Sequence, residues 1–221
     1  MNGVQVSRGL RYGQAMRLTR EAVLHGAFTI LDEYGLGDLT MRRLANQLGV
    51  QPGGLYWHFA NKQTLLAAMA TSIAESATHA SASLPEPDGW RAELEAISGR
   101  FRAALLQHRD GAELVAAGYA LHPGSGEPLE SMIKILQRTG LGVDAAQAAA
   151  AALTHFVLGH STEVQSHDQL RRAGALPTDE DRLPDPDDSF NLGLGIFLDG
   201  LAVQLDGGAA RPTSRQSSAS R

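Results

Sequence analysis

The sequence contains no cysteine, few aromatic residues and no long apolar run. The missing cysteines exclude disulfide bonds, thiolate catalysis and cysteine-ligated zinc, and they fit a cytoplasmic protein. No apolar stretch approaches the ~20 residues of a membrane-spanning helix, and the N-terminus lacks the apolar core of a signal peptide. With a hydrophobic content of 43%, we expect a globular, cytoplasmic protein that has a buried core and no membrane partner.

The charge is distributed unevenly along the chain, although the net charge is only −5. Residues 1–62 hold seven Arg or Lys and four acids, whereas the rest of the chain holds 12 basic and 20 acidic residues. A basic N-terminal part on an acidic body suggests that only this part contacts a polyanion. A chance fluctuation would explain the charges equally well.

Helical periodicity dominates, and no alternating strand pattern occurs, so we predict an all-α fold. In the N-terminal part, Thr19, Thr40 and Asn61 are candidate helix N-caps, and Gly35 and Gly49 are candidate stops. They bound a first helix between Thr19 and Gly35. The further helices that we expect cover about 39–48, 51–57, 60–80, 90–107, 111–121, 127–139, 144–165 and 190–205.

Composition divides the chain into regions. Segment 166–189 is polar, acidic and proline-bearing, so we expect it to be a mobile loop. The regions that we expect are a flexible basic arm (1–17), a helix–turn–helix DNA-binding domain (18–64), a ligand-binding and dimerisation body (65–206) and a disordered tail (207–221). The arm carries Arg8, Arg11 and Arg17; it could reach a DNA minor groove or remain a solvated tail.

The stretch QPGGLYWHFANK, residues 51–62, is unusually rich in aromatics for a chain with six Phe, four Tyr and two Trp. The helix at 39–48, a break at Gly49-Val50 and the helix at 51–57 have the spacing of a helix–turn–helix motif. The second helix of that motif lies in the major groove of DNA. Gly53 and Gly54 carry no side chain, so the backbone there could approach DNA closely.

Side chains around this motif suit a DNA surface. Tyr56, His58 and Lys62 offer hydrogen-bond donors to phosphates, and Arg42 can pair with a guanine edge. We expect Tyr56 and His58 to face away from the protein. Leu55 and Phe59 lie one turn apart, and we expect both to pack inward.

The segment LTMRRLANQLGV…LYWHFANKQTLL resembles the DNA-binding domain of TetR-family repressors. The segments FRAALLQHRDGAEL, ALTHFVLGH and FNLGLGIFLDGLAVQL are similar to the tetracycline-repressor subgroup, so the resemblance covers about residues 18–206. It implies a homodimer with a four-helix-bundle interface that represses transcription by binding a palindromic double-stranded DNA operator. A small-molecule inducer entering the body would release the DNA. By motif position, the DNA contacts implied are Thr40, Arg42, Tyr56, Trp57, His58 and Lys62.

One departure affects base recognition. Pro52, Gly53 and Gly54 stand where the tetracycline repressor has Gln-Pro-Thr. A base-reading amide is therefore missing, and we expect a different operator sequence.

The resemblance also implies a ligand pocket. Val115 stands where that repressor has its magnesium-binding His, and Thr78, Ile97 and Met132 replace other polar groups. An apolar or aromatic ligand is therefore expected rather than magnesium tetracycline. His155 could equally be a buried, hydrogen-bonded histidine. The pocket residues implied are Thr78, Phe101, Val115, Gly118, Tyr119, Met132, Leu136, His155 and Glu163.

A pocket would decide between two functions. A cavity of ~300–1,000 Å³ lined by residues such as Phe101, Tyr119 and Met132 would favour a ligand sensor. Without a cavity, a DNA-binding regulator whose body acts by protein–protein interaction is the alternative. His122 could replace the missing metal-binding His only if its loop folds back.

The sequence contains no motif that supports an enzyme or a metal-binding protein. The glycine-rich nucleotide loops and the serine-hydrolase motif are absent. The HRDG segment at 108–111 superficially matches a kinase catalytic loop, but the other kinase motifs are missing. A metal site from His155, His160 and Glu163 is not favoured, because no H-x-x-x-H pair supports it. We therefore expect no enzyme, no metal and no cofactor.

Overall fold

The computed structural model describes residues 18–79, 88–121, 125–175 and 185–209. Across these ranges the chain forms nine α-helices, one 3-10 helix and no strand, which confirms the predicted all-α fold. The predicted arm and most of the predicted tail lie outside them. The elements are α1 (Arg20–Tyr34), η1 (Leu36–Asp38), α2 (Met41–Leu48), α3 (Pro52–Tyr56), α4 (Lys62–His79), α5 (Gly89–Leu106), α6 (Gly111–Leu121), α7 (Leu129–Arg138), α8 (Val143–Arg172) and α9 (Pro186–Ala209).

Local hydrogen bonds define the N-terminal helices. The Oγ1 atom of Thr19 accepts from the backbone N–H of Ala22 at 3.1 Å, and Thr40 caps α2 in the same way. Asn61 caps α4, since its Oδ1 accepts from the N–H of Thr64 at 2.9 Å. Gly49 ends α2 with a φ of 66°, in the left-handed region that favours glycine. The predicted caps and the predicted stop at Gly49 are confirmed.

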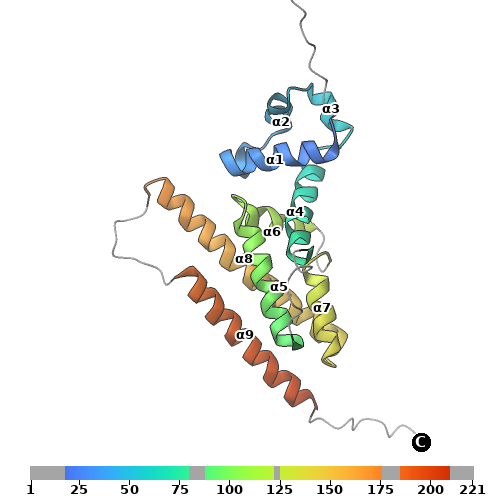
Figure 1. The fold of residues 1–221 in the computed structure, drawn as a ribbon, viewed down its shortest axis with the longest axis vertical. Helices are drawn as coiled ribbons and strands as arrows, with labels where there is room; N and C mark the ends of the chain where they lie inside the picture. The colour runs from blue at the N-terminus through green and yellow to red at the C-terminus, as the bar shows by residue number, and fades with distance from the viewer. Residues whose placement is uncertain (1–17, 80–87, 122–124, 176–184, 210–221) are drawn as a thin grey trace, which may run out of the picture.

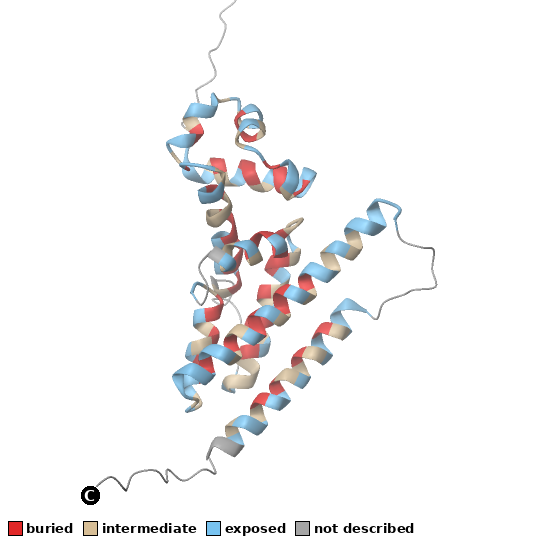
Figure 2. Ribbon diagram, turned by 180° about the vertical axis from the view of Figure 1, so that it is seen from behind, coloured by how far each residue is buried: buried red, intermediate tan, exposed pale blue. Residues whose placement is uncertain are grey.

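Helices α1, η1, α2 and α3 form a small head around one apolar centre. Val23, Ile30 and Leu31 of α1 are fully buried there, as are Leu44 of α2 and Leu55 of α3. Helices α1, α2 and α3 each bury one face only, as the red and blue bands in Figure 2 show. Helix α3 is too short to be stable alone and depends on this packing.

Helix α4 connects the head to the body. It leaves the head and runs alongside α5 and α6 (Figure 1). The body core lies between α5, α6, α7 and α8, and Phe101, Met132 and Leu153 are fully buried in it. Helix α9 lies beside α8 and runs in the opposite direction. Any movement of α4 in the body therefore reaches the head directly.

The structure corrects the boundaries of the predicted mobile loop at 166–189. Helix α8 continues to Arg172, and α9 already begins at Pro186. The start of α9 carries a signal that we missed: Oδ1 of Asp185 accepts from the N–H of Asp187 at 2.8 Å, and Pro186 occupies the first turn. Residues 176–184 lie outside the described residues. Likewise, the first three residues of the predicted disordered tail belong to α9.

Within the described ranges, no helix combines the length and the apolar composition that a bilayer crossing requires.

Candidate DNA-binding surface and ligand pocket

The predicted recognition element, α3, presents two aromatic side chains to solvent. Tyr56 is 51% exposed and Trp57 is 90% exposed, whereas Leu55 and Phe59 are buried at 0% and 3%. The predicted inward packing of Leu55 and Phe59 is confirmed, and Tyr56 faces away from the protein as expected. A tryptophan so fully exposed gains nothing for the fold. Its position suits contact with a partner surface.

The two glycines of α3 leave open space on this surface. A Cβ atom at Gly53 would meet nothing within 4 Å, and one at Gly54 would meet only the side chain of Leu18, at 3.8 Å. The fold would therefore accept a side chain at Gly53. A glycine at this position becomes necessary only if another molecule lies directly against the backbone.

The other predicted DNA-binding residues surround α3. Arg42 is exposed on α2, while His58 and Lys62 are partly exposed at the turn into α4. Thr40 is exposed and accepts the capping N–H of Arg43. Helices α2 and α3 lie at the end of the head that faces away from the body (Figure 1). The structure thus brings the eight predicted residues together in one region of the head.

Arg43, the neighbour of Arg42, has a structural role instead. Its guanidinium lies 3.9 Å from the ring centroid of Tyr34 and forms an ion pair with Asp38. Of the two adjacent arginines, Arg42 is the exposed one and remains the candidate for the predicted DNA contact.

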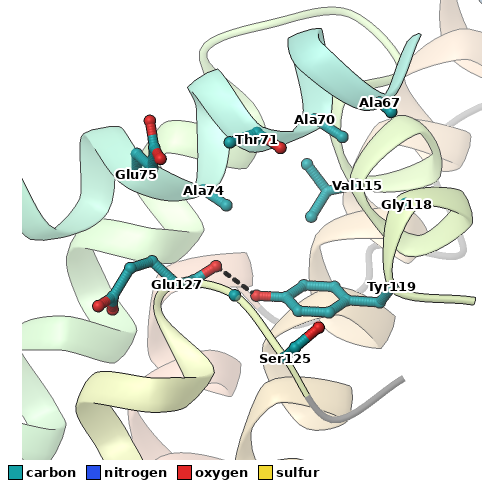
Figure 3. A pocket seen from close by; sticks show the side chains of 11 residues that line it. Ala67, Ala70, Thr71, Ala74, Glu75, Val115, Gly118, Tyr119, Ser125 and Glu127 are labelled. Atoms are coloured by element: carbon teal, nitrogen blue, oxygen red, sulfur yellow. Dashed lines mark hydrogen bonds between the residues drawn. The ribbon is translucent and has the colours of Figure 1, made fainter. Parts of the chain in front are cut away.

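A cavity of about 210 Å³ lies between α4, α6 and the segment that leads into α7 (Figure 3). Three of the predicted pocket residues, Val115, Gly118 and Tyr119, line it. The hydroxyl of Tyr119 donates to the backbone oxygen of Glu127 at 2.6 Å, and burial raises the pKa of this hydroxyl, which keeps it neutral. The cavity is smaller than the ~300–1,000 Å³ that we expected for a sensor.

The other six predicted pocket residues lie elsewhere. Phe101, Met132 and Leu136 are packed in the body core, with at most 1% of each exposed. The hydroxyl of Thr78 donates to the backbone oxygen of Glu75. His155 and Glu163 are exposed on α8, so the alternative of a buried histidine is wrong.

Sequence reasoning missed the α4 wall of the cavity. One face of α4 supplies residues at helical spacing, and the segment before α7 completes the lining. A run of alanines at spacings of three and four was the available signal. The missed lining residues are Ala67, Ala70, Thr71, Ala74, Glu75, Ser125, Gly126 and Glu127.

In the part of the chain that the structure describes, no three His, Asp or Glu side chains are placed so that they could hold a metal ion together. His160 instead lies in an aromatic cluster, 5.3 Å from the ring centroid of Phe190. Burial, followed by the charge of Arg102, lowers the pKa of His160. His122 lies outside the described residues.

Head and body meet at the turn between α5 and α6, which consists of residues 108–111 and is called the HRDG turn below. The backbone N–H of Leu36 donates to Oδ2 of Asp110 at 2.7 Å. Nδ1 of His108 lies 3.1 Å from Oδ2 of Asp32, and its ring stacks on Phe28 with 4.4 Å between centroids. The start of α6 is therefore bound directly to the head.

Two glutamines of α8 hold the HRDG turn from the body side. Nε2 of Gln165 donates to the backbone oxygen of His108 at 2.7 Å, and its Oε1 accepts from the N–H of Ala112 at 3.1 Å. Gln169 donates to Oδ1 of Asp110, whose φ is +57°. The HRDG turn is thus held by the head on one side and by α8 on the other. The match of its sequence to a kinase catalytic loop gave no indication of this structural role.

Comparisons with known proteins agree with this geometry. The family model for bacterial regulatory proteins of the tetR family matches residues 23–69, and that for the tetracyclin repressor-like C-terminal domain matches residues 83–183. Among curated relatives, the class C tetracycline repressor protein of Escherichia coli is 33% identical and covers 84% of this chain and 91% of its own. The class A protein from transposon 1721, also of Escherichia coli, is 35% identical with the same coverage.

Solved structures give the same result. Mycobacterium smegmatis BioQ is 38% identical, with a TM-score of 0.72 over 84% of this chain and 98% of its own. BioQ bound to its natural double-stranded DNA operator is 37% identical, with a TM-score of 0.66 and the same coverage.

A TetR variant from Acinetobacter baumannii AYE in complex with minocycline is 34% identical, with a TM-score of 0.68 over 85% of this chain and 98% of its own. The curated relatives are repressors and not enzymes, which confirms our prediction on that point. With an exposed helix–turn–helix head on a helical body and this similarity over most of its length, the chain belongs to the tetR family of bacterial regulatory proteins, which are DNA-binding transcriptional repressors.

Proposed function

We propose that the protein is a ligand-responsive repressor. Its homodimer binds a palindromic operator through two heads and leaves it when a small apolar or aromatic molecule enters the cavity. The observation that carries this proposal is the position of the cavity, between the helix that carries the head and the helix that begins at the head–body contact.

Operator binding is supported by the exposed residues of the head. Tyr56, Trp57 and Arg42 present one aromatic and cationic surface around α3. Two such heads about one DNA turn apart, ~34–36 Å, would fit the half-sites of a palindrome. A relative at 37% identity, BioQ, has been solved with its own operator. Since Gly53 and Gly54 replace bulkier residues, we expect this operator to differ from that of the tetracycline repressor.

A homodimer is supported by α9. Leu192, Ile196 and Val203 are 68%, 64% and 68% exposed in the single chain. Covering such a face releases water from apolar surface and is favourable. Pairing α8 and α9 with those of a second copy would form a four-helix bundle.

The ligand we propose is not magnesium tetracycline. The cavity wall formed by α4 and α6 includes Ala67, Ala70, Ala74 and Val115. The apolar side chain of Val115 cannot coordinate a metal ion. A relative has been solved in complex with minocycline, which supports a small-molecule ligand for this protein as well. The alanines of the cavity wall support a different ligand.

The mechanism uses the contact between α4 and α6. A Cβ atom at Gly118 would lie only 3.0 Å from the Cβ of Ala70, so the two helices approach each other closely. A ligand that fits better when they separate would displace α4 and the HRDG turn, and with them the head. Its effect is limited to its difference in affinity for the two arrangements.

The alternative function, a body that acts through protein–protein contact, is favoured by one observation. The cavity volume of about 210 Å³ lies below the usual range for drug-sized ligands. In that case, operator binding would persist while no cavity-sized compound released the DNA.

Fluorescence anisotropy with DNA flanking the protein's own gene, over a salt series, tests the proposal. We expect tight, site-selective binding that Tyr56→Ala and Arg42→Ala each weaken by roughly 10-fold or more, as for the loss of a DNA contact. Arg171→Ala, which removes an exposed positive charge from the end of α8, is the control. Weak binding that is equal on any DNA and unchanged by the head variants would contradict the proposal.

A further inference from the structure

The cavity between α4 and α6 has acidic polar groups. Among the described residues that line it, two carry carboxylates, Glu75 and Glu127, and none is Arg, Lys or His. Figure 3 shows both glutamate side chains on one side of the cavity, with Val115, Gly118 and the ring of Tyr119 on the other. A ligand would therefore meet negative groups at one end and an apolar surface at the other.

One of these carboxyl groups is incompletely satisfied. The Oε2 atom of Glu127 is buried, and no described residue forms a hydrogen bond with it. A buried carboxylate oxygen without a partner is unfavourable, because it has lost water and gained nothing in exchange. A positive charge brought next to this carboxyl group by a ligand in the cavity would offset this penalty.

The backbone of Glu127 is held by a hydrogen bond, whereas the Oε2 atom of its side chain has no partner among the described residues. Its backbone oxygen accepts from the Tyr119 hydroxyl at 2.6 Å, and the next residue, Pro128, is buried. The Tyr119 hydroxyl is already paired in this way, and the ring of Tyr119 lines the cavity (Figure 3). The cavity is therefore lined by a carboxylate on one side and an aromatic ring on the other, and both groups attract an organic cation.

We infer that the ligand of this cavity is a small aromatic cation, such as an arylalkylammonium. Its N–H groups would donate to Glu127, and its ring would lie between the α4 alanines and the ring of Tyr119. The volume of about 210 Å³ restricts it to a compact molecule. This inference rests on the proposed function, in which a ligand enters the same cavity, and it adds the charge of that ligand.

Three probes with one ring system and different charge test the inference: naphthylmethylammonium, naphthylmethanol and naphthoate. Their affinities for the full-length protein are measured by isothermal titration calorimetry. We expect the ammonium to bind about 10-fold more tightly than the alcohol, as a charge-assisted hydrogen bond allows, and the carboxylate to bind most weakly. Equal affinity for ammonium and alcohol, or no binding of any probe, would overturn the inference.

The Glu127→Gln variant tests whether Glu127 causes the preference for the ammonium probe. Glu127→Gln keeps the size of the side chain and removes its charge, so it should lower ammonium affinity about 10-fold and leave alcohol affinity unchanged. Glu113→Gln, on an exposed position of α6 outside the cavity lining, removes the same charge and should change neither. Equal losses in both variants would show a long-range charge effect and overturn the site. If Glu127→Gln fails to fold, the comparison of probes on the wild type still decides.

Operator release, measured in parallel by anisotropy, separates this inference from the proposed function. If the alcohol binds and releases the operator as well as the ammonium does, the proposed function stands and the inference fails. If the ammonium binds preferentially but the operator stays bound, the cation site stands and the proposed ligand response fails.

Discussion

The backbone N–H of Leu36, in the head, donates to Oδ2 of Asp110, in the body, at 2.7 Å, although 74 residues of sequence separate them. Asp110 adopts this position with a φ of +57°, which few non-glycine residues other than Asn and Asp adopt readily. Its other carboxyl oxygen accepts from Gln169 of α8. One side chain thus connects the head, the start of α6 and the long helix α8.

Replacing this side chain should loosen the connection. We expect Asp110→Ala to lower the free energy of unfolding by about 1–3 kcal/mol, because two hydrogen bonds are lost and the left-handed backbone becomes strained. Asp110→Asn is the matched control, since Asn tolerates the same φ and keeps one acceptor oxygen. Urea unfolding at a fixed protein concentration measures both. Equal stability of the alanine and asparagine variants would show that neither the acceptor nor the backbone conformation matters.

Two glycines should respond oppositely to alanine. A Cβ atom at Gly111, in the HRDG turn, would overlap the backbone oxygen of Leu105, whereas one at Gly99, within α5, would meet nothing within 4 Å. We expect Gly111→Ala to destabilise the protein by about 1–3 kcal/mol and Gly99→Ala to stabilise it by about 0.5–1 kcal/mol. Thermal unfolding of the two variants beside the wild type tests this. A stable Gly111→Ala protein would mean that the turn can shift.

Replacing Trp57 should lower the affinity for the operator without changing the stability of the fold. Because its side chain is 90% exposed, Trp57→Ala should change the free energy of unfolding by no more than ~0.5 kcal/mol. Operator affinity should fall about 10-fold, as for the loss of a DNA contact. Leu170→Ala, which trims an exposed apolar side chain on α8, controls for the loss of apolar surface. Unchanged operator affinity in the Trp57 variant would remove this residue from the DNA-binding surface.

His160 should make stability depend on pH. Burial beside Phe156 and Phe190, with Arg102 nearby, lowers its pKa, while Glu163 and Asp187 oppose this shift. The unfolded chain therefore binds a proton more readily than the folded chain. Stability from this group is present above the unfolded pKa of ~6.5 and falls as the pH drops below it.

Thermal unfolding between about pH 7.5 and pH 5 measures this dependence. His160→Gln should reduce the loss of stability on acidification relative to the wild type. His155→Gln, which removes an exposed imidazole from the same helix, is the control. A wild type whose stability does not fall over this range, or a His160 variant that loses stability as steeply, would contradict the prediction.

Local chemistry explains what could be predicted from the sequence. The caps at Thr19, Thr40 and Asn61 each depend on a partner three residues away, so a short motif contains the whole interaction. The inward direction of Leu55 and Phe59 likewise follows from helical spacing. The family pattern added the positions of the predicted DNA-binding residues, all of which lie in the head or at the start of α4.

Long-range contacts explain what could not be predicted. The polar end of α8 suggested a loop, but Gln169 has its partner in Asp110, which is 59 residues away. The cavity depends on the distance between α4 and α6 and on the placement of Glu127, and no short motif contains either. Phe101 and Met132, expected in the pocket, are instead enclosed by the packing of α5, α7 and α8.

The exposure of Trp57 also makes the protein its own optical reporter. The chain has only two tryptophans, and the other, Trp90, lies at the start of α5, partly buried against the body core. A Trp90→Phe variant would leave one indole, exposed at the end of α3, whose emission should change when DNA covers it. The complementary Trp57→Phe variant would leave one indole, that of Trp90, whose fluorescence reports on the body alone. The fluorescence of these two unlabelled variants could thus measure the rate of ligand binding and the rate of operator release separately.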